Sequence, residues 1–194
     1  MTPRILVMAG SRRSASLNRL LAHAAAASLQ RAGAQVTALS MDEHALPMYD
    51  GDVESGSGLP PAALRLKALF KAHHGVFVAS PEYNASVSPL LKNVIDWTSR
   101  STVAESGKVP FQGKVFALAS ASPSALGGQR GLAHLRQILQ SLGAWVLPAQ
   151  LGIPNAARAF SAEGAPADAA QAKALDDLAA ELVSAAARLA PPVA

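Results

Sequence analysis

The segment Gly10–Asn18 holds the side chains of this sequence that are best suited to binding an anion. It follows the apolar run 4–9 and precedes an alanine-rich helical pattern, so it should join a buried strand to a helix. Free amides and the dipole at a helix start favour an anion there. The segment adds hydroxyl, amide and guanidinium donors, which suit a phosphate monoester: Ser11, Arg12, Arg13, Ser14, Ser16 and Asn18.

The same segment lacks both glycine-rich patterns that cradle nucleotide phosphates. Neither G-x-G-x-x-G nor G-x-x-x-x-G-K-S/T occurs in it. A pyrophosphate needs glycines for close approach of the backbone, whereas serine side chains can hold a monophosphate. A second interpretation stays open, in which Ser16 or Asn18 caps the helix and the arginines lie in solvent. Capping and phosphate binding do not exclude each other.

The segment 80–89 follows another apolar run and could contact a planar ring. Pro81 and Pro89 stiffen the turn, and Tyr83 offers a flat face where such a ring would lie. The Asn84 amide can hydrogen-bond the heteroatoms of the ring. An ordinary turn whose serines cap the next helix would have the same residues, so both interpretations stay open.

The segment 120–130 follows a third apolar run and is rich in hydroxyl groups. Its pair Gly127-Gly128 permits a close approach of the backbone to a ligand. Turn chemistry alone would also account for this composition. Three such segments after separate strands nevertheless favour one shared binding site.

The composition restricts the chemistry that the site can perform. The 194 residues include no cysteine, so thiol nucleophiles, disulfides and cysteine-held metal centres are excluded, and redox chemistry needs a bound cofactor. The five histidines show no H-E-x-x-H spacing, and no G-x-S-x-G motif occurs. No catalytic side chain and no metal ligand is therefore predicted, and His134 is assigned a structural role.

Net charge and hydropathy further restrict the class of protein to which this sequence can belong. The net charge of +4 is spread without a basic run, which gives nucleic-acid binding little support. No apolar run approaches the roughly 18 residues of a membrane span, so we expect no membrane association and a cytoplasmic protein. The length fits a single domain over residues 1–194.

Apolar runs alternate with helical patterns along the chain, which predicts an α/β fold: a doubly wound, five-stranded parallel sheet in a three-layer α/β/α sandwich, strand order 2-1-3-4-5. The predicted strands are Arg4–Ala9, Gln35–Ser40, Gly75–Ser80, Lys114–Ser120 and Trp145–Gln150. The predicted helices are Leu17–Ala32, Pro61–His73, Pro89–Arg100, Gly128–Leu142 and Asp168–Leu189. The segments 47–60 and 101–113 are predicted to be surface loops.

The helix predicted at Pro89–Arg100 is more apolar than one buried face requires. Lys92 and Asp96 are four residues apart and predict a surface ion pair. The apolar excess predicts a second buried surface against the same helix of a two-fold mate. It consists of Leu90, Leu91, Val94, Ile95 and Trp97.

Three motifs occur in order along the chain. They are Gly10-Ser11-x-Arg13-x-x-Ser16-x-Asn18, then Pro81-Glu82-Tyr83-Asn84-x-Ser86 continuing to Leu91-Lys92-Asn93-x-Ile95-Asp96-Trp97, then Ser122-Pro123-x-x-x-Gly127-Gly128-x-Arg130-x-x-x-His134-Leu135-Arg136. Together they resemble the NADPH-dependent FMN reductase family, which includes bacterial quinone, chromate and azo-dye reductases of the flavodoxin-like fold. Leu46-Pro47-Met48-Tyr49-Asp50 also resembles the family's loop after the second strand.

The resemblance implies roles for particular residues. The residues implied at the FMN phosphate are Ser11, Arg13, Ser16 and Asn18, with Leu17 between them also implied to bind the cofactor. Those implied at the isoalloxazine ring are Pro81, Glu82, Tyr83 and Asn84, with Ser120 and Gly127 at its border. Two residues depart from the family pattern: Ala85 stands where glycine is usual, and Leu132 stands where many members have glutamine near the subunit contact.

The resemblance also implies the reaction and the assembly. NADPH or NADH would pass a hydride to N5 of FMN, and a quinone, flavin, azo dye or chromate would then take the electrons in ping-pong order. A homodimer or homotetramer would complete the flavin site. Two alternatives remain: a non-catalytic flavin sensor, and a flavodoxin-type electron carrier, whose usual acidic surface disagrees with the net charge of +4.

Overall fold

A five-stranded parallel sheet forms the centre of the computed structural model, which describes residues 1–161 and 164–190. The strand order is β2-β1-β3-β6-β7, which is the predicted 2-1-3-4-5 order of a flavodoxin-like sheet because β4 and β5 form a separate pair. The strands are β1 (Arg4–Ala9), β2 (Gln35–Leu39), β3 (Gly75–Ala79), β6 (Val115–Ala121) and β7 (Trp145–Ile153).

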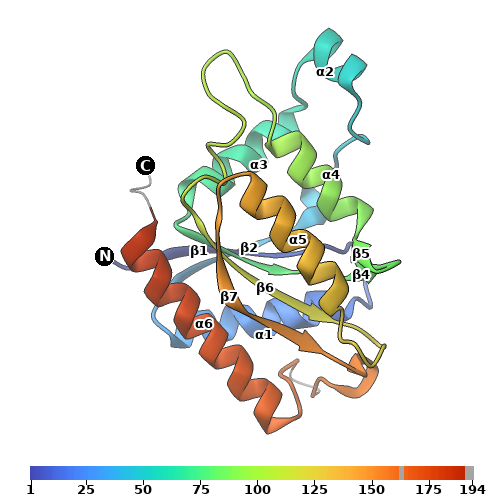
Figure 1. Cartoon of the computed structure of the whole chain (residues 1–194), viewed down its shortest axis with the longest axis vertical. Helices are drawn as coiled ribbons and strands as arrows, with labels where there is room; N and C mark the ends of the chain where they lie inside the picture. Colours follow the sequence, from blue (N-terminus) through green and yellow to red (C-terminus); the bar gives the residue numbers. More distant parts are fainter. Residues whose placement is uncertain (162–163, 191–194) are drawn as a thin grey trace.

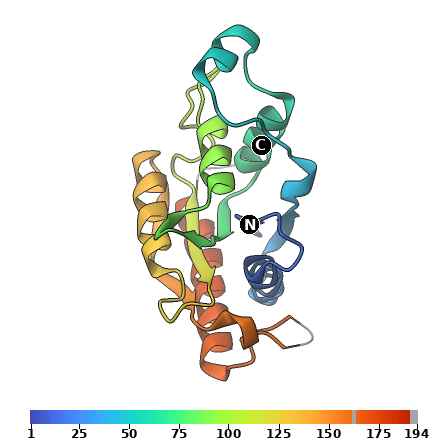
Figure 2. The same cartoon turned by 90° about the vertical axis from the view of Figure 1, so that its right-hand side faces the viewer.

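Helices cover both faces of the sheet (Figure 1). One face packs against α1 (Leu17–Arg31) and α6 (Ala169–Leu189), the other against α3 (Pro61–Ala72), α4 (Pro89–Thr98) and α5 (Gln129–Ser141). Figure 2 shows these layers from the side. Every residue of β3 and of β6 is buried. Their uninterrupted apolar runs follow from this burial, because parallel strands need apolar side chains on both faces.

The structure adds elements that the sequence pattern did not predict. Within the predicted loop 47–60 lies α2 (Gly51–Ser57), which has no buried residue and therefore no apolar periodicity to reveal it. A hairpin forms from β4 (Glu82–Tyr83) and β5 (Ser86–Val87). The remaining short elements are the 3-10 helices η1 (Met41–Glu43) and η2 (Ala156–Arg158).

Trp97 is fully buried within its own chain, so its predicted contact with a second subunit is wrong. Its indole Nε1 donates to the carbonyl oxygen of Pro47 at 2.9 Å, and the Tyr49 ring meets it edge-on at 5.0 Å. The chain segment before α2 therefore covers Trp97, and the other buried apolar residues of α4 pack into the core beneath the helix: Leu91, Val94 and Ile95. The predicted ion pair between Lys92 and Asp96 is confirmed at 2.8 Å.

The carboxyl ends of β1, β3 and β6 lie side by side, because these strands are neighbours and parallel. Their three following loops therefore meet at one edge of the sheet, where ligands bind in doubly wound folds.

In the described part of the chain, no helix is long and apolar enough to span a membrane. The same residues contain no cluster of acidic or histidine side chains that could hold a metal ion.

Candidate functional site

The loop after β1 is pressed against the loop after β3. The Gly10 amide donates to the Ala79 carbonyl at 2.9 Å, and the Ser88 hydroxyl donates to the Gly10 carbonyl at 2.7 Å. A Cβ atom on Gly10 would lie 3.0 Å from Cδ of Pro81. Glycine is required at this position because the two loops leave no room for a side chain.

Asn18 ties the first turn of α1 to the end of β6. Its Nδ2 donates to the Ala121 carbonyl at 2.9 Å, and its Oδ1 accepts from the Ala121 amide at 3.0 Å. The side chain is almost fully buried. Its oxygen and one of its N–H donors are thus used within the protein, so we assign Asn18 to positioning the phosphate loop.

The loop's arginines have different partners. Arg12 Nε lies 3.1 Å from Asp42 Oδ1, and Arg19 Nη1 from the first helical turns lies 3.2 Å from Asp42 Oδ2. Arg13 is exposed, and its guanidinium has no partner among residues 1–161 and 164–190. Arg13 is thus the loop cation that is free to bind a ligand phosphate.

The serines shape the same loop. The Ser16 hydroxyl accepts from the Arg19 amide at 3.3 Å and caps α1, as predicted. The Ser11 hydroxyl accepts from the Arg13 amide at 3.3 Å, which leaves its own O–H free to donate. The amide of Leu17 belongs to the first turn, where a helix leaves its N–H groups without an internal partner.

A strained turn carries the predicted ring contacts. Asn84 (φ 51°) and Ala85 (φ 63°) are both left-handed and form the two-residue turn between β4 and β5. Ala85 is strained here, because a side chain costs about 1–2 kcal/mol in this conformation whereas glycine adopts it freely. The turn leaves Tyr83 and Asn84 exposed at the sheet edge.

Glu82 clamps the hairpin to the start of α5. Its carboxylate accepts from Arg130 Nε at 2.9 Å and Nη2 at 2.5 Å, and from the Gly131 amide at 2.9 Å. Burial alone would raise the pKa of Glu82, but the hydrogen bonds from Gly131 and Arg130 outweigh it and hold the pKa below its ordinary value. The carboxylate therefore faces α5, which leaves the Glu82 backbone for any contact with a bound ring.

The glycine turn before α5 covers a buried hydroxyl. Gly127 and Gly128 are left-handed, and a Cβ atom on Gly128 would lie 2.0 Å from Ser120 Oγ. Ser120 is fully buried, and its hydroxyl has no hydrogen-bond partner among the described residues. A buried polar group without a partner requires an explanation, and a polar ligand at this turn would supply one.

Sequence reasoning missed the roles of Arg130 and Gly131 in this clamp. A Cβ atom on Gly131 would lie 3.0 Å from the carbonyl oxygen of Ser86, so α5 touches the hairpin backbone. No local pattern indicates this contact, because Glu82 and Arg130 are 48 residues apart. The predicted structural role of His134 has support in its ring Nδ1, which lies 3.1 Å from Ser86 Oγ.

The strand order and the three loops at one sheet edge define a flavodoxin-like FMN protein. The chain belongs to the NADPH-dependent FMN reductase family, which it matches over residues 3–158. It is an oxidoreductase with FMN as its cofactor and NAD(P)H as its electron donor. An unpaired arginine beside free amides and a helix N-terminus fits the single phosphate of FMN.

Known relatives and structures agree with this assignment. An NAD(P)H-dependent FMN reductase from Pseudomonas aeruginosa is 36% identical over 185 residues, which cover 93% of this chain and 89% of the relative. A quinone reductase from Escherichia coli is 35% identical over 149 residues, 74% of this chain and 72% of the relative. The structure of the flavoenzyme NAD(P)H:(acceptor) oxidoreductase FerB from Paracoccus denitrificans superimposes with a TM-score of 0.81 at 26% identity, covering 98% of this chain and 100% of that one.

Arg13→Gln should weaken FMN binding about tenfold or more, because a charge-assisted hydrogen bond contributes about 1.5–3 kcal/mol. Arg12→Gln is the matched control, since Arg12 already pairs with Asp42. Calorimetric titration of the apoprotein with FMN measures both. Equal losses in the two variants would contradict the assignment of Arg13.

Glu82→Gln should weaken FMN binding about five- to tenfold, because the amide can no longer accept from both Arg130 and Gly131, and an unsatisfied buried donor costs about 1–3 kcal/mol. Fluorescence titration with FMN measures this loss. Glu181→Gln, at an exposed position of α6, is the control. Unchanged affinity in Glu82→Gln would show that the clamp does not position the hairpin for the cofactor.

Proposed function

We propose that this protein reduces quinone-like two-electron acceptors with NADPH or NADH by a ping-pong reaction. The proposal depends on two exposed side chains at one edge of the sheet: Arg13, which has no partner among the described residues, and Tyr83, which offers a ring surface. Bound FMN supplies hydride transfer, and the protein supplies orientation and electrostatics. Names of relatives, among them quinone reductase and 2-hydroxy-1,4-benzoquinone reductase, support a quinone as the acceptor.

In this proposal each loop has a separate task. The loop after β1 binds the phosphate through Arg13, the Ser11 hydroxyl and the amides at the start of α1. The hairpin orients the ring through Tyr83 and Asn84, and the clamp from Glu82 prevents the hairpin from swinging away. The glycine turn with Gly127 borders the ring, which leaves one ring face open to both substrates in turn.

Ping-pong turnover predicts parallel lines in double-reciprocal plots of initial rate against NADPH at several fixed benzoquinone concentrations. Stopped-flow reduction by NADPH without acceptor should go to completion in a single two-electron step. Intersecting lines would indicate a ternary complex instead. Absence of turnover with any acceptor would contradict the proposed reaction and favour a non-catalytic flavin sensor or a flavodoxin-type electron carrier.

We further propose that the protein is a homodimer, in which α4 and α5 face the partner. A groove of about 460 Å³ runs between the hairpin, α4 and α5, and it exposes apolar groups of Val87, Pro89 and Ile138 beside Gln137. Such a partly apolar groove suits a self-complementary contact. The proposal includes one domain over residues 1–194 and a cytoplasmic location, where reduced nicotinamide nucleotides are recycled.

Gln137→Arg should shift the protein from dimer to monomer, because it places a cation at the centre of a two-fold contact from an exposed position that folding does not require. Sedimentation velocity at micromolar concentration measures the shift. Ala180→Arg, at an exposed position on α6 across the sheet, is the control and should leave the dimer intact. A wild-type monomer with full activity would contradict the proposed dimer.

A further inference from the structure

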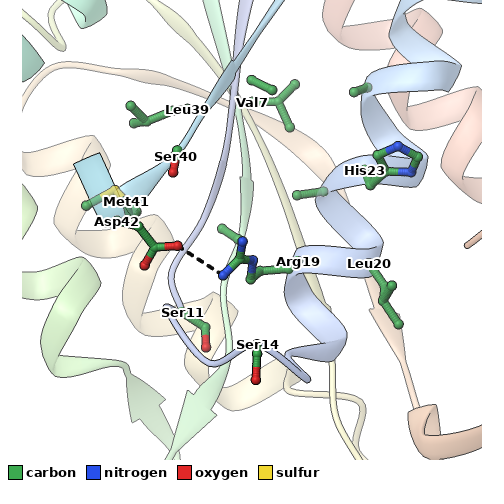
Figure 3. A pocket seen from close by; sticks show the side chains of 14 residues that line it. Val7, Ser11, Ser14, Arg19, Leu20, His23, Leu39, Ser40, Met41 and Asp42 are labelled. Carbon is green, nitrogen blue, oxygen red and sulfur yellow. Dashed lines mark hydrogen bonds and ion pairs between the residues drawn. The ribbon is translucent and has the colours of Figure 1, made fainter. Parts of the chain in front are cut away.

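A second cavity, of about 460 Å³, lies between α1 and the edge strand β2, beside the phosphate loop (Figure 3). Its walls are largely apolar and unusually rich in small side chains, which leave a gap between helix and strand that larger residues would fill. These small residues are Ala9, Ala22, Ala26 and Ala38. None of the residues around it comes from the hairpin or the glycine turn, so the FMN ring does not account for this cavity.

Charged side chains border this cavity on one side. Figure 3 shows Arg19 reaching from α1 toward Asp42, which follows β2. Arg12 pairs with the other oxygen of the same carboxylate. All three side chains are about half exposed, at 48% for Arg12, 44% for Arg19 and 47% for Asp42. Two cations thus share one anion, and the excess positive charge suits a ligand that carries a phosphate.

The place of this cavity in the fold indicates which phosphate ligand it suits. In doubly wound dinucleotide-binding folds, the residue that distinguishes a ribose 2′-hydroxyl from a 2′-phosphate lies near the end of the second strand. Here Asp42 stands just after β2, and Arg12 from the loop after β1 and Arg19 from α1 reach it beside an apolar cavity that can take a flat base. We propose that this cavity binds the adenosine 2′-phosphate end of NADPH, with Arg12 and Arg19 contacting the 2′-phosphate. The proposal rests on the proposed use of NADPH at the ring.

The sheet order supports a dinucleotide that spans both places. β1 lies between β2 and β3, so the cavity and the hairpin flank the same loop after β1. Ser11 and Ser14 of this loop also line the cavity. A dinucleotide with its nicotinamide at Tyr83 and its adenosine in the cavity would therefore pass beside the phosphate loop, whose donors stay with the FMN phosphate.

Asp42 limits the preference for the phosphorylated dinucleotide in this arrangement. It occupies one donor of each arginine, so a bound 2′-phosphate has to compete with its carboxylate. Removing that carboxylate while keeping its shape should therefore strengthen binding of a 2′-phosphate and leave a ligand without one unaffected.

The first test is calorimetric titration of the FMN-loaded protein with 2′,5′-ADP, an adenosine ligand that carries the 2′-phosphate but cannot transfer hydride. Ala26→Leu should weaken binding about tenfold by filling the cavity, a cost typical of displaced contacts. Ala27→Leu, at the next position of α1 and also half-buried but outside the cavity, should bind like the wild type. Equal binding by the two variants, or no binding by the wild type, would overturn the proposal.

The second test compares 2′,5′-ADP with 5′-AMP. Arg19→Gln should weaken 2′,5′-ADP about tenfold and Asp42→Asn should strengthen it several-fold, with 5′-AMP unchanged in both. Identical responses of the two ligands would overturn the role of the arginines. FMN content and NADH oxidation, measured on the same samples, report on the proposed function independently: a protein that turns over NADH but binds 2′,5′-ADP no better than 5′-AMP retains the function and lacks this site.

Discussion

The site depends on the two hydrogen bonds between the Asn18 side chain and the backbone of Ala121. These bonds fix the start of α1 against the end of β6, across the position of β3. The side chain is buried, so water does not compete for either bond, and losing one would leave a buried backbone group unpaired. The helix dipole, the loop amides and Arg13 therefore have a fixed direction relative to the hairpin and the glycine turn.

Strain at the hairpin is offset by the clamp beneath it. Asn84 and Ala85 are both left-handed. Ala85 costs about 1–2 kcal/mol in this conformation, because it has a Cβ atom and no polar side chain to hydrogen-bond locally. The Glu82 carboxylate accepts charge-assisted hydrogen bonds from Arg130 and Gly131, each of which contributes a comparable amount. The Glu82 hydrogen bonds thus hold the turn that carries the exposed Tyr83, so the tyrosine ring keeps its position before a ligand binds.

The arginines near the phosphate loop show how similar side chains acquire different uses. Arg12 and Arg19 are oriented by Asp42, whereas the exposed Arg13, next to Arg12 in the sequence, has no partner in the described part of the chain. Residue type alone cannot distinguish them, because all three are arginines between positions 12 and 19. The carboxylate that separates their roles comes from the end of β2, and only the sheet places it there.

The class of fold, a cap of α1 at Ser16 or Asn18 and the three loops at the sheet edge could all be predicted from the sequence alone. These features rest on local patterns. Apolar runs, helical periodicity and turn residues each involve a few neighbouring positions, so they can be recognised in the sequence without the structure. Three features required the folded structure: the burial of Trp97 under the chain's own loop, the clamp from Glu82 to Arg130, and the cavity beside Asp42. Each of these depends on contacts between residues far apart in the chain, and the packing that brings them together leaves no periodic trace in the sequence.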